Sequence, residues 1–179
     1  LADEVRSNSK KAITKLRKLG VKNIIMLTGD TKQKAKMIAD ELGINEVRAE
    51  LLPQDKAKIV KELMNEGKKV AFVGDGINDA PALISAHVGI SMSRGADIAK
   101  ATADISLLKD DIMAVVEAKE YANKTMNLIN NNFNATVGIN SCILAGATFG
   151  VFSPIVTAVL HNGTTIGLLF NSIKGVNIR

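Results

Sequence analysis

Residues 74–81 read GDGINDAP and place two carboxylates, Asp75 and Asp79, directly after an apolar run. Carboxylate oxygens are hard ligands of the kind that Mg2+ prefers. Gly74 and Gly76 allow a tight turn and the close approach of a phosphate. GDG with a nearby aspartate can also be a simple turn, but the full string between a strand and a helix favours a magnesium and phosphate site.

Two further motifs contain groups that could contact a phosphate. Thr28-Gly29-Asp30 follows another apolar run, and its hydroxyl and backbone N–H groups could hold phosphoryl oxygens. The same residues could instead form an N-terminal helix cap. Lys56, in the string PQDK at 53–56, could reach a phosphate as a point charge near a helix start, or could be an ordinary solvated lysine.

The segments that must position these motifs alternate between strands and helices. Short apolar runs bounded by turn residues predict strands at 23–27, 46–49, 69–73, 88–92 and 105–108. Apolar residues at helical spacing predict helices at 11–19, 31–42, 53–65, 80–86 and 110–124. The alternation predicts an α/β domain at 1–124, with a parallel sheet covered by helices on both faces.

The remainder of the chain, 125–179, is nearly free of charged side chains. Two uncharged stretches, about 135–152 and 155–173, are each about long enough to cross a hydrocarbon core of ~30 Å as a helix. They predict a two-helix transmembrane hairpin; a pair of buried core helices is the alternative. The basic residues that flank the outer ends predict that both ends are cytoplasmic: Lys119, Lys124, Lys174 and Arg179.

Composition argues against a nucleic-acid-binding protein. The net charge of +5 comes from mixed signs rather than a dense basic stripe, and the chain has one Tyr and no Trp for base stacking. The single cysteine, Cys142, cannot form an internal disulfide and lies in an apolar run, where it is expected to behave as a small hydrophobe.

Taken together, MLTGD at 26–30, PQDK at 53–56 and VGDGINDAPAL at 73–83 resemble the phosphorylation domain of P-type ATPases, within the haloacid dehalogenase superfamily. Two helices after this domain resemble the heavy-metal-transporting class. The resemblance covers essentially the whole chain, as a carboxyl-terminal part of such a pump. It implies a partial Rossmann-like phosphorylation domain followed by the helical hairpin.

The resemblance also implies roles for individual residues. Asp75 resembles the Mg2+ ligand and Asp79 its supporting carboxylate. Thr28 resembles the hydroxyl that contacts the transferred phosphoryl group, and Lys56 the lysine that steadies the phosphoaspartate. The other implied phosphate- and ATP-binding positions are Gly29, Asp30, Gly76 and Asn78.

Two more sets of residues match the pattern of this family less completely. Asp3 and Arg6 resemble the D-x-x-R that follows the nucleotide-binding domain, with Ser7 in place of the usual Pro. Polar residues of the last helix resemble contacts to the transported ion: His161, Thr164, Thr165, Asn171 and Ser172. His161 could instead face the interface or a neighbouring helix. Asn162 stands where some relatives have an acidic residue, so the resemblance does not name the metal.

The string DKTGT, with the aspartate that takes the phosphate in this family, does not occur in the sequence. The resemblance therefore implies one part of an ATP-driven heavy-metal exporter in the cell membrane, with a cytoplasmic phosphorylation domain and inactive by itself. It implies Mg2+ as cofactor, ATP as substrate, and membrane lipid, the remaining pump domains and a transition-metal cation as partners. The alternatives are a non-catalytic membrane-anchored or regulatory protein, and a phosphatase of the same superfamily.

Overall fold

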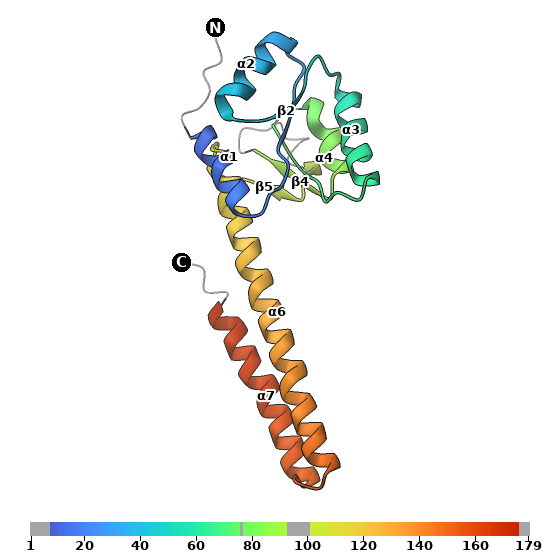
Figure 1. Cartoon of the computed structure of the whole chain (residues 1–179), viewed down its shortest axis with the longest axis vertical. Helices are drawn as coiled ribbons and strands as arrows, with labels where there is room; N and C mark the ends of the chain where they lie inside the picture. The colour runs from blue at the N-terminus through green and yellow to red at the C-terminus, as the bar shows by residue number, and fades with distance from the viewer. Residues whose placement is uncertain (1–7, 76, 93–100, 176–179) are drawn as a thin grey trace. The chain divides into compact units, whose positions relative to one another are not determined.

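The structure is a computed structural model, and it describes residues 8–75, 77–92 and 101–175. Five positions named in the sequence analysis lie outside the described residues: Asp3, Arg6, Ser7, Gly76 and Arg179. The chain divides into two compact units, Leu1–Lys119 and Glu120–Arg179. In Figure 1 the first unit contains the strands and the short helices, and the second consists of two long helices.

Unit 1, as far as it is described, holds two parallel sheets. The first pairs β1 (Ile25–Leu27) with β2 (Glu46–Arg48). The second pairs β3 (Ala71–Gly74) with β4 (Val88–Ser91), and β4 with β5 (Ile105–Ser106). The predicted α/β class with parallel strands is confirmed, although the strands are shorter than the apolar runs that predicted them. Within the described residues no ladder joins β1 to β3, so each of these strands has one free edge.

The helices of unit 1 begin and end at residues whose chemistry explains the boundary. α1 spans Ser9–Lys18, and α2 spans Lys32–Leu42 and ends at Gly43, whose φ of 72° is one that glycine adopts without strain. α3 spans Pro53–Asn65, as predicted, with proline at a position where its missing N–H costs nothing. A short 3₁₀ turn, η1 (Ile77–Asp79), leads into α4 (Ala80–Ser85).

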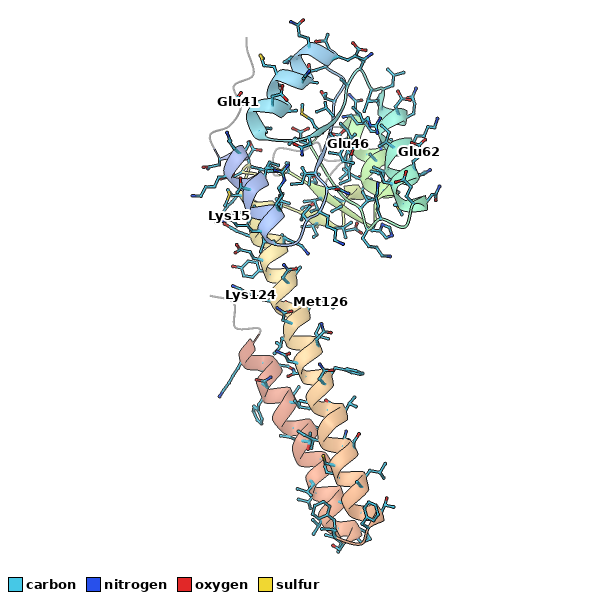
Figure 2. The ribbon with its side chains drawn as sticks, viewed as in Figure 1. Lys15, Glu41, Glu46, Glu62, Lys124 and Met126 are labelled. Carbon is cyan, nitrogen blue, oxygen red and sulfur yellow. The ribbon has the colours of Figure 1, made fainter. Side chains whose placement is uncertain are left out.

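Two small hydrophobic clusters hold these elements together. The first joins α3, β3 and α4 through Val60, Phe72, Ala82 and Leu83. The second joins α1 and α2 through Ile13, Ala39 and Ile44. Fully burying a Val or Leu side chain contributes about 1.5–3 kcal/mol, so the first cluster fixes α3 beside the end of β3. The opposite helix faces are solvated, as the exposed Glu41 on α2 and Glu62 on α3 illustrate (Figure 2).

Unit 2 is a helical hairpin. α6 (Met113–Thr148) begins in unit 1 and runs without interruption through the region where the sequence predicted two separate helices, 110–124 and 135–152. α7 (Pro154–Gly175) returns beside it (Figure 1). Gly150, at φ 72°, terminates α6. A Cβ at Gly146 would collide with the ring of Phe152, so glycine is required where the turn folds back.

None of the helices in the described residues is both long and apolar enough to cross a membrane. The predicted transmembrane spans at 135–152 and 155–173 are therefore not supported. α6 ends at Thr148, which leaves the apolar residues 149–152 outside the helix. Both helices also carry polar side chains that reduce their apolar character: Asn132, Asn134, Asn140, His161, Asn162 and Asn171.

Candidate active site

An ion pair between Lys56 and Asp79 joins two of the predicted motifs. Lys56 lies in the first turn of α3, and Asp79 ends η1, so helix packing brings together residues that are 23 positions apart. The distance from Lys56 Nζ to Asp79 Oδ1 is 2.7 Å, and the two side chains are 15% and 12% exposed. A charge-assisted contact this short and this shielded holds the lysine ammonium at the carboxyl end of β3.

The second oxygen of Asp79 is also engaged. Asp79 Oδ2 accepts a hydrogen bond of 3.3 Å from the backbone N–H of Asp75, the residue that follows β3. A Cβ at Gly74 would lie 2.7 Å from the Cβ of Asp79, closer than side chains approach. Gly74 is thus needed so that Asp79 can fold back over the strand end, whereas its predicted role was in a tight turn and in the approach of a phosphate.

Thr28 and Asp30 form a compact loop after β1. Thr28 Oγ1 donates to Asp30 Oδ2 at 3.1 Å and accepts from the backbone N–H of Asp30 at 3.1 Å. Lys34 Nζ lies 3.2 Å from Asp30 Oδ1. The Lys34 ammonium and then the Thr28 hydroxyl lower the pKa of Asp30 below its ordinary value of 3.8. Asp30 is therefore anionic at neutral pH, and its two carboxylate oxygens are engaged by the Thr28 hydroxyl and the Lys34 ammonium.

The lowered pKa of Asp30 predicts a specific effect of Lys34→Met. Removing the ammonium should raise the pKa of the Asp30 carboxyl towards 3.8. Because the folded-state pKa is depressed, the contribution of Asp30 to stability is present above the unfolded-state pKa and is lost as pH falls through the folded-state value. Lys34→Met should thus reduce the loss of folding stability that protonation of Asp30 causes as the pH falls. Carbon-detected NMR titration of the Asp30 carboxyl measures the shift.

Lys58 provides a matched control, because its partner Glu62 on α3 is likewise four positions away, at 4.0 Å. Lys58→Met should leave the titration of Asp30 unchanged. An Asp30 pKa that is the same in Lys34→Met and in the parent protein would contradict the assigned cause.

The carboxylates at the end of β3 suit a magnesium ion. Asp79 is committed to Lys56 and to the Asp75 N–H, while Asp75 is exposed. Mg2+ is commonly bound through one or two carboxylates, with waters and substrate phosphates completing its octahedron. Among the described residues no group of three or more His, Cys, Asp or Glu side chains could hold a metal ion. Of the two carboxylates, Asp75 is the one left open to an approaching cation, because Asp79 is engaged by Lys56 and by the Asp75 N–H.

The structure brings some predicted site residues together and leaves others apart. Lys56, Asp79 and the backbone of Asp75 form one group, and Thr28 and Asp30 form another. Gly29 and Asn78 are exposed beside these groups. A backbone hydrogen bond of 3.1 Å from Leu51 N–H to the Thr28 carbonyl links the Thr28 loop to the segment that leads into α3.

Polar side chains also connect the two helices of unit 2. Asn132 Nδ2 donates to Ser172 Oγ at 2.8 Å, and Asn171 Nδ2 donates to Asn132 Oδ1 at 2.6 Å. Closer to the turn, His161 Nδ1 lies 3.1 Å from Asn140 Oδ1. Asn132 and Asn140 were not among the predicted site residues, although an asparagine within a helix that is otherwise largely apolar is a signal for such a contact.

The five residues predicted to contact a transported ion do not form one cluster. His161 and Asn171 are separated by ten positions on α7, or about 15 Å along a helix axis. The hydroxyls of Thr164 and Thr165 donate to the carbonyls of Leu160 and His161 on their own helix. A single ion could therefore contact either the His161 end or the Asn171 end of the set, but not both.

Known proteins resemble this chain in sequence and in fold. Residues 1–87 match the family of haloacid dehalogenase-like hydrolases. The whole chain is 42% identical to a manganese-exporting P-type ATPase of Mycobacterium leprae and 39% identical to a cadmium-transporting ATPase of Staphylococcus aureus. A crystal structure of a zinc-transporting PIB-type ATPase superposes on 98% of the chain, with a TM-score of 0.88 and 36% identity.

The match is complete for this chain but partial for its relatives. The chain spans 25% of the manganese and cadmium transporters and 28% of the zinc transporter. The relatives are named as manganese, cadmium and zinc transporters. The haloacid dehalogenase-like match includes the Thr28 loop and the GDGINDAP motif. The chain is thus a homologue of the heavy-metal P-type ATPases, with a haloacid dehalogenase-like domain in its first half.

Proposed function

We propose that this chain is part of an ATP-driven exporter of transition-metal ions, in which it supplies the magnesium and phosphate contacts. The observation that carries the proposal is the Lys56–Asp79 ion pair at the carboxyl end of β3, beside the exposed Asp75. A shielded ammonium next to carboxylates that suit Mg2+ is an arrangement that stabilises a phosphoryl group in transit.

The phosphate acceptor would come from the remainder of the pump. β1 and β3 each keep a free edge within the described residues, and both precede a motif with phosphate-contacting groups. A parallel strand between them would place its own carboxyl end beside Thr28, Lys56 and Asp75. We infer that this strand carries the aspartate to which ATP transfers its γ-phosphoryl group.

In this mechanism each residue has a separate task. Thr28 Oγ1, whose hydrogen is donated to Asp30 Oδ2 in this structure, would redirect it to a phosphoryl oxygen when phosphate is bound. The exposed Gly29 and Asn78 would be further phosphate- and ATP-binding positions. The Lys56 ammonium neutralises charge on the phosphorylated aspartate. Asp75 holds Mg2+, which supplies electrophilic stabilisation of the phosphoryl oxygens when bound. Asp79 orients Lys56 and the Asp75 backbone.

The location and partners of the protein follow from this role. Because ATP is the proposed substrate, unit 1 would face the cytoplasm, and the pump as a whole would reside in the cell membrane in contact with lipid. The remaining three quarters of the pump would be its main partner, in agreement with the 25% coverage of the relatives. Transition-metal ions are the proposed cargo, and His161 with Asn140 is a candidate contact on the route.

Metal-dependent ATP hydrolysis by the full-length pump tests the proposal. We expect the purified, lipid-reconstituted protein to hydrolyse ATP only with Mg2+ present, and to be stimulated by one or more of Zn2+, Cd2+, Co2+, Fe2+, Mn2+ and Cu+. Inverted vesicles should hydrolyse added ATP, and right-side-out vesicles should not. Phosphatase activity that forms no acid-stable phosphoenzyme and ignores these metals would instead support a phosphatase of the superfamily.

A further inference from the structure

Glu50 has a backbone conformation that L-amino acids rarely adopt. Its φ is 58°, and it is the non-glycine residue with a positive φ in the part of the chain that the structure describes. In this left-handed region the Cβ crowds the following carbonyl, which is why glycine usually occupies it. A strained residue of this kind persists only where its surroundings hold it in place.

Two consecutive backbone hydrogen bonds hold Glu50 and its neighbour. Glu50 N–H donates to the Asp30 carbonyl at 2.9 Å, and Leu51 N–H donates to the Thr28 carbonyl at 3.1 Å. Both acceptors belong to the phosphate-contacting loop after β1. The left-handed turn at Glu50 therefore attaches the end of β2 to the loop at the end of β1.

The Glu50 carboxylate contributes little to this attachment. Its Oε2 lies 3.5 Å from Lys32 Nζ, and the two side chains are 52% and 82% exposed. An ion pair so open to solvent is weak and is screened by salt. The role of Glu50 must therefore lie in its backbone conformation.

From Leu51 the chain runs directly into the helix that carries Lys56. Leu52 N–H donates to Asp55 Oδ2 at 2.9 Å, and Lys56 N–H donates to the Leu52 carbonyl at 3.3 Å. The two segments also lie in close proximity, because a Cβ at Gly29 would come within 3.3 Å of the Leu51 carbonyl oxygen. A change in the turn at Glu50 would thus move the Thr28 loop relative to the start of α3.

We propose that Glu50 is a positioning residue for phosphoryl transfer, whose left-handed turn fixes the Thr28 loop relative to Lys56. The inference rests on the proposed function of these two residues. Groups that stabilise a phosphoryl group must be held close to their productive geometry, and a displacement of about 1 Å can cost on the order of 100-fold in rate. Glu50 would set this geometry without contacting the phosphate.

Substitutions at position 50 in the full-length pump separate backbone from side chain. Valine is β-branched and does not tolerate the left-handed region, so Glu50→Val should lower the rate of phosphoenzyme formation by on the order of 100-fold. Glycine adopts this region freely, so Glu50→Gly should form phosphoenzyme at close to the parent rate. Equal loss in both variants would overturn the proposal, because the carboxylate would then be responsible.

Glu46 on β2 offers a matched control (Figure 2). It pairs with Arg48 at the surface, at 3.0 Å, and sits in an extended strand where valine is favourable. Glu46→Val makes the same chemical change and should leave phosphoenzyme formation unchanged. If Glu50→Val shows no cooperative melting transition, Glu50→Ala, which lacks the β-branch but still carries a Cβ, supplies the same comparison with a smaller expected loss.

Amide hydrogen exchange provides a readout that does not depend on pump activity. Glu50→Val should accelerate exchange at residues 28–30 and 50–56, whereas Glu50→Gly and Glu46→Val should not. A parent pump that forms no phosphoenzyme would count against the proposed function, and exchange would still decide the role of Glu50. Parent-like exchange in Glu50→Val would overturn the inference, even if the pump is active.

Discussion

Replacing Asp75 with asparagine is expected to lower Mg2+-dependent phosphoenzyme formation by on the order of 1,000-fold in the full-length pump. Asparagine keeps the shape of the side chain and removes the negative charge that a hard cation requires. The Asp75 backbone N–H that binds Asp79 Oδ2 is retained. Because the Asp75 side chain is exposed, the substitution should leave the melting temperature nearly unchanged, so the loss would be one of chemistry rather than folding.

Incorporation of radiolabel from ATP into an acid-stable phosphoenzyme measures this effect. Asp40→Asn, at an exposed position of α2, makes the same change away from the site and should retain parent activity. Normal phosphorylation of the Asp75→Asn pump would show that Asp75 is not the residue that binds Mg2+. A large drop in melting temperature would indicate that the carboxylate supports the fold instead.

Much of the first unit could be predicted from sequence because its signals are local. Pro53 predicted the start of α3, and apolar runs flanked by turn residues located β1 and β3. The ion pair between Lys56 and Asp79 brings two of the three motifs together through the packing of α3 beside η1. The Thr28 motif and the Asp75 motif, which each follow a strand, are not joined by a side-chain hydrogen bond or ion pair within the described residues, because β1 and β3 belong to different sheets there.

Other features depend on contacts that a single sequence does not display. The pairing of Asp30 with Lys34 and the left-handed turn at Glu50 arise from loop geometry, and a glutamate carries no signal for a positive φ. The continuity of α6 was missed because the prediction followed apolar content. Residues 125–134 mix asparagines with apolar side chains but contain no proline or glycine, so nothing interrupts the helix there.

The second large effect concerns the Lys56–Asp79 ion pair, which should stabilise the fold as well as the reaction. The side chains are 15% and 12% exposed, so removal of one partner leaves a shielded charge with poor solvation. Lys56→Met and Asp79→Asn should each lower the free energy of unfolding by about 2 kcal/mol, which is below the roughly 3–5 kcal/mol for a fully buried pair because both side chains keep some exposure. Both variants should also lose phosphoenzyme formation.

Combining the two substitutions shows whether their effects on the free energy of unfolding are coupled or additive. In Lys56→Met/Asp79→Asn neither charge remains, so the double variant should be more stable than the sum of the single losses predicts, by about 1–2 kcal/mol. Chemical denaturation of all four proteins measures this difference. The exposed pair Lys58–Glu62, at 4.0 Å, is the control cycle and should show a coupling of no more than about 0.5 kcal/mol.

The free energy of unfolding and the rate of phosphoenzyme formation should respond differently to the double substitution, and this difference tests the role of the ion pair. Restored stability in Lys56→Met/Asp79→Asn would come from removing an unpaired charge, whereas phosphoryl transfer needs the ammonium itself. The double variant should therefore regain stability and remain unable to form phosphoenzyme. Recovery of both properties together would mean that the pair is only a structural support for α3 and β3. Strict additivity of the two stability losses would mean that the 2.7 Å contact does not hold in solution.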